Sequence, residues 1–308
     1  MASLQAHLAV WFTKWRVKRR LRGCRDYRAA RAILRPLPYK IPPSVRITPA
    51  NVSGIPGEWV ESPNPADAVM LYLHGGGYFG CSPKTHRSIT VWFALHGFRV
   101  FAPDYRLAPE NPFPAAVDDA VAVYRGLLAG GHAPQGMVIA GDSAGGGLAL
   151  SLMLALRAAG MPLPAAAALF SPWTDLAATG ESIRTNAARC AMFNGEDIGP
   201  SARYYLGNAD PRNPLASPLY ADLKGLPPLL IHVGADECLR DDSTRVAEKA
   251  KAAGVPVELK IWPVVPHAWQ LALQILPEAR QSLRETAEFL TRHAAAANST
   301  GVGLGQHA

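Results

Sequence analysis

The sequence predicts an α/β fold: a mostly parallel central sheet of about eight strands, flanked by helices and covered by a helical cap. The middle of the chain alternates short apolar runs, rich in β-forming residues, with helical patterns, which is typical of such sheets. The intervals between successive runs are long enough for right-handed crossovers. With 308 residues, 49% of them hydrophobic, the chain can bury a sizeable core and is not a disordered segment.

The expected strands are six apolar runs, and residues 45–61 add one or two more at an antiparallel edge. In chain order the runs are Val69–Leu73, Arg99–Ala102, Met137–Ala140, Ala166–Phe170, Pro228–Val233 and Val257–Ile261. The helical patterns are Lys84–Leu95, Ala115–Leu128, Gly145–Ala159, Asp242–Ala253 and Glu278–His293.

Two segments do not follow this alternation: the N-terminal stretch to about Pro43, and the stretch from Ala177 to about Asp222. Insertions in such sheets gather at the carboxyl ends of the strands, where ligands bind, so we expect both segments to form the cap. The predicted organisation is an N-terminal helical cap segment at 1–43, a main domain at 44–295 with a cap insertion at about 177–222, and a flexible tail at 296–308.

The positive charge of the chain is confined to its N-terminus. The formal net charge is +7. Residues 1–40 contain eleven Lys and Arg residues and one acidic residue, which leaves 20 basic and 23 acidic residues for the rest. A near-neutral body lacks the basic footprint of a nucleic-acid-binding fold, so no nucleic-acid partner is expected.

This basic segment also carries an apolar stripe, because Leu4, Leu8, Trp11 and Trp15 share one helical face. We expect the stripe to pack on the body while the basic face meets solvent. Attachment to an anionic membrane surface is the alternative, and membrane contact is not expected.

The cellular location is predicted from three features that the sequence lacks: a secretory signal, a membrane-spanning run and paired cysteines. The basic residues follow the apolar ones, which reverses the order of a secretory signal, and no run approaches the roughly 20 apolar residues that span a bilayer. The four cysteines are scattered, without a CxxC pair, which indicates reduced thiols. A cytoplasmic protein is predicted.

A serine between glycines follows the apolar run Met137–Ala140 directly. The pattern G-x-S-x-G, from Gly141 to Gly145, lies between a predicted strand and a predicted helix, which is the context of a nucleophile elbow. The sharp turn strains Ser143 and exposes its hydroxyl next to the amides of the helix start. We predict that Ser143 is a nucleophile and not an idle residue of a glycine-rich turn.

A second glycine cluster, His-Gly-Gly-Gly-Tyr at 74–78, ends the run Val69–Leu73. It lacks the Lys and Ser/Thr of a P-loop and the third glycine of a dinucleotide-binding loop. Closely approaching amides suit an oxyanion hole, and we expect the N–H groups of Gly76, Gly77 and Ala144 to form it. His74 is expected to fix the loop by hydrogen bonding.

The predicted general base is His267, in a loop after the last predicted strand, at the same sheet edge as Ser143. His232 lies within a predicted strand and is expected to be packed there. The partner acid is expected in the preceding loop, where Asp236 and Glu237 are adjacent and both chemically suitable. Asp241 and Asp242 are expected to cap the next helix.

Together with Asp-Tyr-Arg-Leu-Ala-Pro-Glu at 104–110 and Ser-Pro-Trp-Thr-Asp at 171–175, these motifs resemble those of the hormone-sensitive-lipase-like bacterial carboxylesterases, an α/β-hydrolase family. The resemblance covers roughly residues 45–295. Aligning the family's acid loop on Leu239, Arg240 and Asp241 implies Glu237 as the acid, thirty residues before His267, although most members have Asp there. The resemblance also implies a cap built from the two exceptional segments, and residues 104–110 are expected to brace the loops.

The predicted function is a carboxylesterase that hydrolyses short to medium acyl-chain esters with Ser143, His267 and Glu237, through an acyl-enzyme intermediate. The acyl-chain range is what the family resemblance implies. No cofactor or metal is expected, since no HExxH or comparable cluster is present.

Three alternatives remain open at this point. An amide, carbamate, thioester or lactone would serve the same chemistry, and a long-chain lipase would need a mobile apolar lid. A non-catalytic ligand-binding relative is disfavoured because His267 is present, whereas the plant gibberellin receptors, which resemble this family, lack that histidine.

Substrate contacts are expected from aromatic and Met residues at the boundary of cap and core, namely Trp173, Met192, Phe193, Tyr204 and Trp269, although such residues also fill ordinary cores. The run Val257–Ile261 is a sheet edge by its position, and a homodimer through that edge is a hypothesis.

Overall fold

A computed structural model describes residues 2–24, 26–34, 39–63 and 68–301, and its strands form one sheet in the order β1-β2-β4-β3-β5-β6-β7-β8. β1 and β2 form an antiparallel edge, and the strands from β3 onward pair in parallel, which confirms the predicted sheet. The strands are β1 Arg46–Val52, β2 Ile55–Glu61, β3 Val69–Leu73, β4 Arg99–Pro103, β5 Met137–Asp142, β6 Ala166–Phe170, β7 Leu229–Gly234 and β8 Val257–Trp262.

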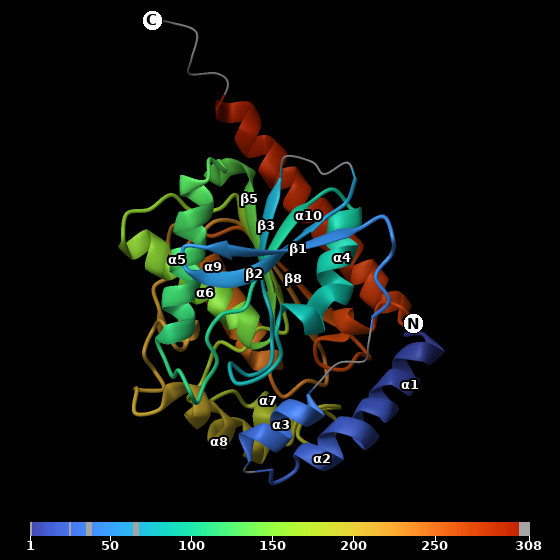
Figure 1. Cartoon of the computed structure of the whole chain (residues 1–308). Helices are drawn as coiled ribbons and strands as arrows, with labels where there is room; N and C mark the ends of the chain where they lie inside the picture. The colour runs from blue at the N-terminus through green and yellow to red at the C-terminus, as the bar shows by residue number, and fades with distance from the viewer. Residues whose placement is uncertain (1, 25, 35–38, 64–67, 302–308) are drawn as a thin grey trace, which may run out of the picture.

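Helices cover both faces of the sheet (Figure 1). One face meets α4 Arg87–Leu95 and α10 Pro277–Gly301, and the other meets α5 Ala115–Ala129, α6 Ala144–Ala158 and α9 Arg240–Ala252. Alternate residues of β3 serve the two layers, because Leu71 and Leu73 face the α5–α6 side whereas Met70 and Tyr72 face the α4–α10 side. This double burial explains why the central strands read as continuous apolar runs.

The two exceptional segments are helical and lie together beyond the carboxyl ends of the central strands (Figure 1). The first contains α1 Leu4–Thr13, a π-helical turn η1 Lys14–Lys18, α2 Arg19–Leu21 and α3 Tyr27–Ile33, and the second contains α7 Ser182–Thr185 and α8 Gly195–Leu206. Short 3-10 turns are η2 Pro83–His86, η3 Pro134–Gly136, η4 Pro218–Tyr220 and η5 Trp269–Ala272. The segments are joined by Lys18, which donates to the carbonyl of Cys190 at 2.9 Å.

The apolar stripe of α1 does not pack on the body, so that prediction is wrong. Leu4, Leu8, Trp11 and Trp15 are 72%, 57%, 64% and 54% exposed. The side that packs is built from small residues instead, with Ala6 fully buried. A small side chain lets the helix lie close to the body, where the backbone amide of Ser3 donates to Glu278 at 2.7 Å.

The C-terminal helix is longer than predicted. α10 continues to Gly301, beyond the predicted end at His293 and into the flexible tail predicted to begin at 296. Residues 294–297 are all alanine, the residue type with the highest helix propensity, which accounts for the extension. The remainder of the expected tail, 302–308, lies outside the described residues.

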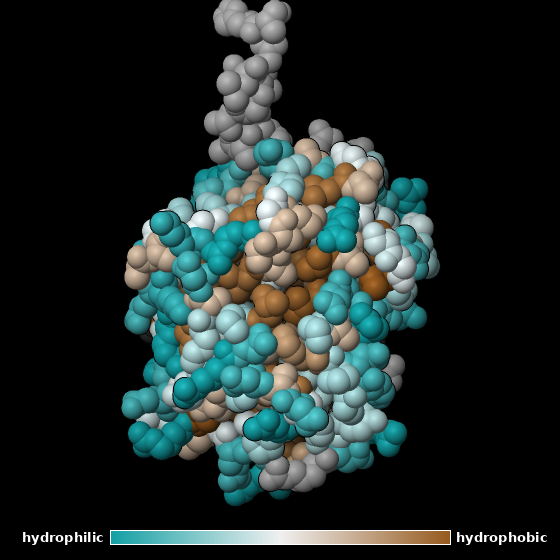
Figure 2. All heavy atoms as spheres, turned by 90° about the vertical axis from the view of Figure 1, so that its left-hand side faces the viewer, coloured by the Kyte–Doolittle hydropathy of each residue, from teal (hydrophilic) through white to brown (hydrophobic). Residues whose placement is uncertain are grey.

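One face of the molecule has an apolar area on its surface. Figure 2 views the side that is on the left in Figure 1 and shows an apolar area ringed by hydrophilic side chains. β8 forms an edge of the sheet as expected, and Ile261 on it is 45% exposed. Within the described ranges, no helix combines the length and apolar character needed to cross a membrane.

At the start of α6, the backbone of Gly145 packs directly against the backbone at the end of β3, and substitutions can test this contact. A Cβ atom at Gly145 would lie 2.0 Å from the carbonyl oxygen of Leu73, so Gly145→Ala should destabilise the fold by about 3 kcal/mol or more. At Gly130, which ends α5, the closest such contact is 3.3 Å, and Gly130→Ala should change stability by less than about 1 kcal/mol. Urea unfolding followed by circular dichroism measures both, and equal effects would contradict this packing.

Candidate active site

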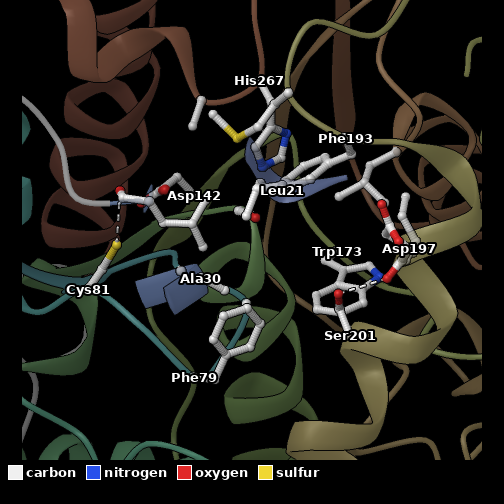
Figure 3. Close-up of a pocket in the computed structure, with 18 of the residues that line it drawn as sticks. Leu21, Ala30, Phe79, Cys81, Asp142, Trp173, Phe193, Asp197, Ser201 and His267 are labelled. Atoms are coloured by element: carbon white, nitrogen blue, oxygen red, sulfur yellow. Dashed lines mark hydrogen bonds between the residues drawn. The ribbon is translucent and has the colours of Figure 1, made fainter. Parts of the chain in front are cut away.

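A cavity of about 110 Å³ lies between the cap and the carboxyl ends of the central strands (Figure 3). Its wall combines residues from both cap segments with residues from the loops after β3 and β5 and the loop that follows β8. Ser143, His267, Gly76 and Gly77 all line it. Among the residues that the structure describes, no cluster of three or more His, Cys, Asp or Glu side chains could hold a metal ion.

Ser143 occupies the sharp turn between β5 and α6. Its backbone φ is +54° with ψ −122°, a conformation that non-glycine residues rarely adopt and that clusters at functional sites. Backbone hydrogen bonds hold it there, since its amide donates to Phe170 at 2.8 Å and its carbonyl accepts from Trp173 at 2.9 Å. The predicted strand–turn–helix context of Ser143 is present.

His267 reaches the cavity from the loop after β8. Its Nδ1 lies 2.5 Å from Oε2 of Glu237, and both side chains are almost fully buried. The other ring nitrogen, Nε2, is buried and has no hydrogen-bond partner among the described residues. The ring also packs edge-on against Phe193, with centroids 4.9 Å apart. One nitrogen is therefore fixed by a carboxylate, and the other is left for a ligand or Ser143.

Glu237 is held by three groups at once. Its Oε1 accepts hydrogen bonds from the Ser171 hydroxyl at 2.6 Å and from the Gly234 amide at 2.7 Å, which leaves Oε2 for His267. The neighbouring Asp236 turns away, since its side chain is 45% exposed and forms an ion pair with Arg189 at 3.0 Å. Of the two acids that the loop offered, Glu237 is the one that contacts the imidazole.

The electrostatic balance at His267 favours the protonated ring. Burial by itself lowers the pKa of His267, but the charge of Glu237 and the hydrogen bond to it raise the pKa more. The net result is a pKa above the ordinary value of 6.5. An imidazolium formed here is therefore stabilised by its carboxylate neighbour.

The glycine loop after β3 lies beside Ser143. Gly76 and Gly77 have φ values of +119° and +65°, and their amides have no acceptor in the described part of the protein. A Cβ at Gly76 would lie 2.3 Å from the carbonyl oxygen of Gly80, so only glycine fits. Ala144 is the first residue of α6, where amides have no intrahelical partner. The three predicted donors are thus available next to one cavity.

Residues 104–110 brace this loop as expected, since the Tyr105 hydroxyl donates to the carbonyl of His74 at 2.7 Å. The His74 ring stacks on Tyr105 and contacts the carbonyl of Gly75 at 2.8 Å. Burial and the nearby His86 lower the pKa of His74 to about 3, so the ring is neutral. His232 is packed in β7, where its Nδ1 meets the Ser282 hydroxyl at 2.8 Å, as predicted.

Asp142 is a buried side chain for which no role was predicted from the sequence. It accepts from the Tyr72 hydroxyl at 2.7 Å, from the Gly75 amide at 3.0 Å, and lies 3.3 Å from Nε2 of His86. It thereby ties the glycine loop to the elbow. The only sequence signal was its place beside Ser143 in the G-x-S-x-G pattern, since His86 is distant in the chain.

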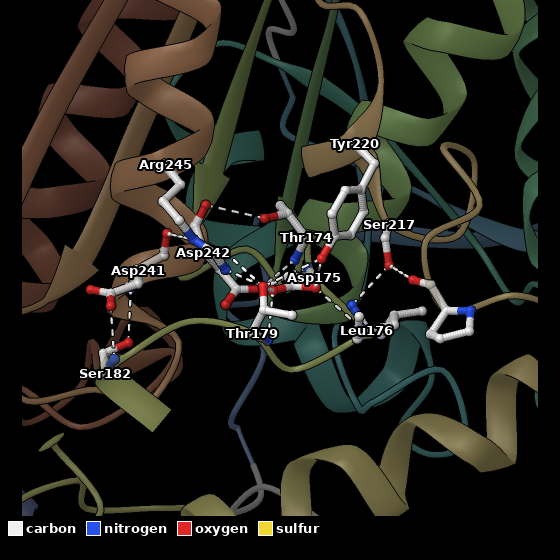
Figure 4. A network of polar contacts seen from close by, with 12 residues as sticks. Thr174, Asp175, Leu176, Thr179, Ser182, Ser217, Tyr220, Asp241, Asp242 and Arg245 are labelled. Carbon is white, nitrogen blue, oxygen red and sulfur yellow. Dashed lines mark hydrogen bonds and ion pairs between the residues drawn. The ribbon is translucent and has the colours of Figure 1, made fainter. Parts of the chain in front are cut away.

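The predicted capping role of Asp241 and Asp242 is wrong, because both lie inside the first turn of α9 (Figure 4). Asp242 accepts from the amides of Thr174 and Asp175, both at 2.8 Å, and Asp241 accepts from the amide of Ser182 at 2.7 Å. Burial, with the neighbouring Asp175 carboxylate, raises the pKa of Asp242 to about 7. These side chains join α9 to the loop after β6 and to the cap insertion.

Four of the five expected substrate contacts line the cavity: Trp173, Met192, Phe193 and Tyr204. Trp269 does not, and that expectation needs correction. Its neighbour Ala268 adopts a left-handed conformation, and Trp269 is buried against Trp262 with ring centroids 5.7 Å apart. Sequence reasoning missed the N-terminal contributions of Leu21, Ala30 and Leu34, for which no motif exists.

Comparison with known proteins reveals clear relatives. Residues 70–271 match a family described as having an alpha/beta hydrolase fold. An acetyl-hydrolase of Streptomyces hygroscopicus is 44% identical over 86% of either chain, and an esterase of Acinetobacter venetianus is 39% identical over 81% of this chain and 83% of its own. A crystal structure of an esterase from the bacterial hormone-sensitive lipase family has 43% identity and a TM-score of 0.88, covering 96% of this chain and 99% of its own.

The contact between His267 and Glu237 can be tested directly by NMR titration of the imidazole. The wild-type pKa should lie above 6.5, and Glu237→Gln should lower it, because the charge and the hydrogen bond that oppose the effect of burial are then lost. Asp236→Asn is the matched control and should leave the value unchanged, since that carboxylate is exposed and paired with Arg189. A shift in the control alone would contradict the assignment.

Proposed function

This chain belongs to the alpha/beta hydrolase fold family, in its bacterial hormone-sensitive-lipase group, and we propose that it is a carboxylesterase acting on short to medium acyl chains. The observation that carries the proposal is the meeting of Ser143, in a strained elbow, with a carboxylate-bound His267 at one cavity. That arrangement suits nucleophilic attack on an acyl carbon.

In the proposed mechanism, Nε2 of His267 takes the proton of Ser143 as Oγ attacks the ester carbonyl. Glu237 fixes the tautomer by accepting from Nδ1 and stabilises the imidazolium that forms. His267 then returns the proton to the departing alcohol, which leaves an acyl-serine. Water, activated by the same nitrogen, releases the acid and restores the hydroxyl. The unpartnered state of Nε2 supports this role.

The oxyanion is proposed to be held by the amides of Gly76, Gly77 and Ala144. Such donors stabilise negative charge where it develops, and they need no reorganisation during the reaction. The loop carrying Gly76 and Gly77 is fixed by Asp142, through the amide of Gly75.

The size of the cavity supports a short acyl group. In another protein, an apolar cavity of roughly 150 Å³ accommodates benzene. The cavity here measures about 110 Å³, and much of its wall is apolar, including Leu21, Trp173 and Phe193. An acyl chain of a few carbons fits this space, and the name of the Streptomyces relative, an acetyl-hydrolase, agrees with that range.

The first experiment is a panel of p-nitrophenyl esters with acyl chains from two to sixteen carbons. Turnover should peak at the short end, at eight carbons or below. Ser143→Ala should lower turnover at least about 10³-fold, while circular dichroism shows that the fold is intact. A folded mutant that retains turnover would overturn the proposal, and an inactive wild type would direct the search to amides, carbamates, thioesters and lactones.

A second experiment compares the two adjacent acids. Glu237→Gln should lower kcat about 10²–10⁴-fold, because the imidazole loses its orienting carboxylate. The acid limb of the pH–rate profile should also move to lower pH, since a neutral His267 is needed and its pKa falls with the loss of Glu237. Asp236→Asn should change kcat less than about threefold. The reverse ranking of the two variants would assign the role to Asp236.

A further inference from the structure

The N-terminal helix concentrates exposed apolar side chains on one surface. Eight large hydrophobic side chains are strongly exposed among the described residues, and five of them are Leu4, Leu8, Trp11, Phe12 and Trp15. Isolated exposed hydrophobic residues are ordinary, whereas contiguous exposed apolar patches mark interaction sites. We call these five residues the N-terminal apolar stripe.

The exposure follows from how the helix is held, at two separate points. At its start, the amide and the hydroxyl of Ser3 donate to the Glu278 carboxylate at 2.7 and 2.9 Å. Further along, Lys18 donates to the carbonyls of Ala187 and Cys190 at 2.5 and 2.9 Å. Between these points the buried Ala6 faces the body. The helix therefore cannot roll its apolar stripe inward without breaking these contacts.

Basic side chains border the apolar stripe. A groove of about 360 Å³ is lined by Trp11 and Trp15 together with Lys14, Arg19 and Arg22. Arg19, Arg20 and Arg22 are exposed in the turns that follow. The apolar side chains come mainly from α1, which has no Lys or Arg of its own, and the basic side chains follow in η1 and α2. Apolar side chains next to Lys and Arg match the interface of an anionic bilayer, where the first enter the acyl boundary and the second meet the headgroups.

We propose that the N-terminal apolar stripe and its basic border dock this protein on the surface of an anionic lipid bilayer. A second copy of the chain is a poorer occupant, because a two-fold interface would bring the same basic border against itself. Nucleic acid would use the charges but leave Leu4 and Leu8 without a partner. A bilayer with anionic headgroups satisfies both the apolar and the basic side chains.

Docking would bring the cavity near the lipid. Leu21 and Cys24, which follow the basic turns, line the cavity of Ser143, and Asn194 borders both that cavity and the groove. An ester dissolved in the bilayer would therefore meet the cavity from the docked side. The docking itself does not depend on the proposed function, because it is measured without turnover.

The test is co-sedimentation of the full chain with vesicles of phosphatidylcholine alone, or with phosphatidylglycerol added. The wild type should bind the anionic vesicles and be released by salt, since exposed charges are screened. The double change Trp11→Ser and Trp15→Ser, and the double change Arg19→Glu and Arg22→Glu, should each weaken binding at least about tenfold. Unchanged thermal midpoints would show that both variants fold.

Matched controls separate this surface from general stickiness and net charge. Leu95→Ser with Ile261→Ser removes two exposed hydrophobic side chains elsewhere, and Arg125→Glu with Lys251→Glu reverses two exposed charges on α5 and α9, across the molecule from α1 in Figure 1. Both controls should bind like the wild type. The proposal would be overturned if the wild type did not bind vesicles, or if variants and controls lost binding equally. It would also be overturned by a dimer that Trp11→Ser and Trp15→Ser dissociate, or by equally tight binding of the wild type to duplex DNA.

Discussion

The site depends on the close approach of the first turn of α6 to the end of β3. Carbonyl oxygens of Leu73 and His74 occupy the space where a side chain of Gly145 would lie, so backbone meets backbone without intervening atoms. This contact places the first amides of α6 beside the glycine loop that follows β3. It also forces the chain through the strained conformation of Ser143. The Ser143 side chain and the backbone amides of the glycine loop and of α6 are therefore brought together by the packing of two elements.

Buried carboxylates hold the surrounding loops in position, and each accepts more than one hydrogen bond. Asp142 joins the glycine loop to the elbow, Glu237 joins the loop after β7 to His267, and Asp242 joins α9 to the loop after β6. Burying a carboxylate costs folding free energy unless the group is hydrogen-bonded, so each of these carboxylates requires donor groups at defined positions around it. Burial lowers the pKa of His74 and keeps its ring neutral, whereas at His267 the charge of Glu237 and the hydrogen bond to it outweigh burial and raise the pKa.

The cap completes the cavity from two distant parts of the chain. Leu21 and Ala30 come from the N-terminal helices, and Met192 and Phe193 from the insertion after β6. Hydrogen bonds from Lys18 and from the amide of Gly23 to the insertion keep the two parts together. The N-terminal helices thus serve the cavity on one side, while the N-terminal apolar stripe on the other side faces outward.

The sequence by itself determined the sheet, the helices between its strands, the elbow at Ser143 and the positions of Gly76, Gly77 and His267. These follow from local periodicity and from motifs whose residues are contiguous, so short-range physics is enough. The residues by themselves left Asp236 and Glu237 open and the family resemblance implied Glu237, which the tertiary structure places against His267. Only the tertiary structure decided that Trp269 is buried in the core and that the stripe of Leu4 and Trp11 faces solvent. Neighbouring residues on a loop point in different directions, and an amphipathic helix offers two faces. Which loop residue points inward, and which helix face packs on the body, depends on partners such as Ser171 and Glu278, more than sixty positions away in the chain.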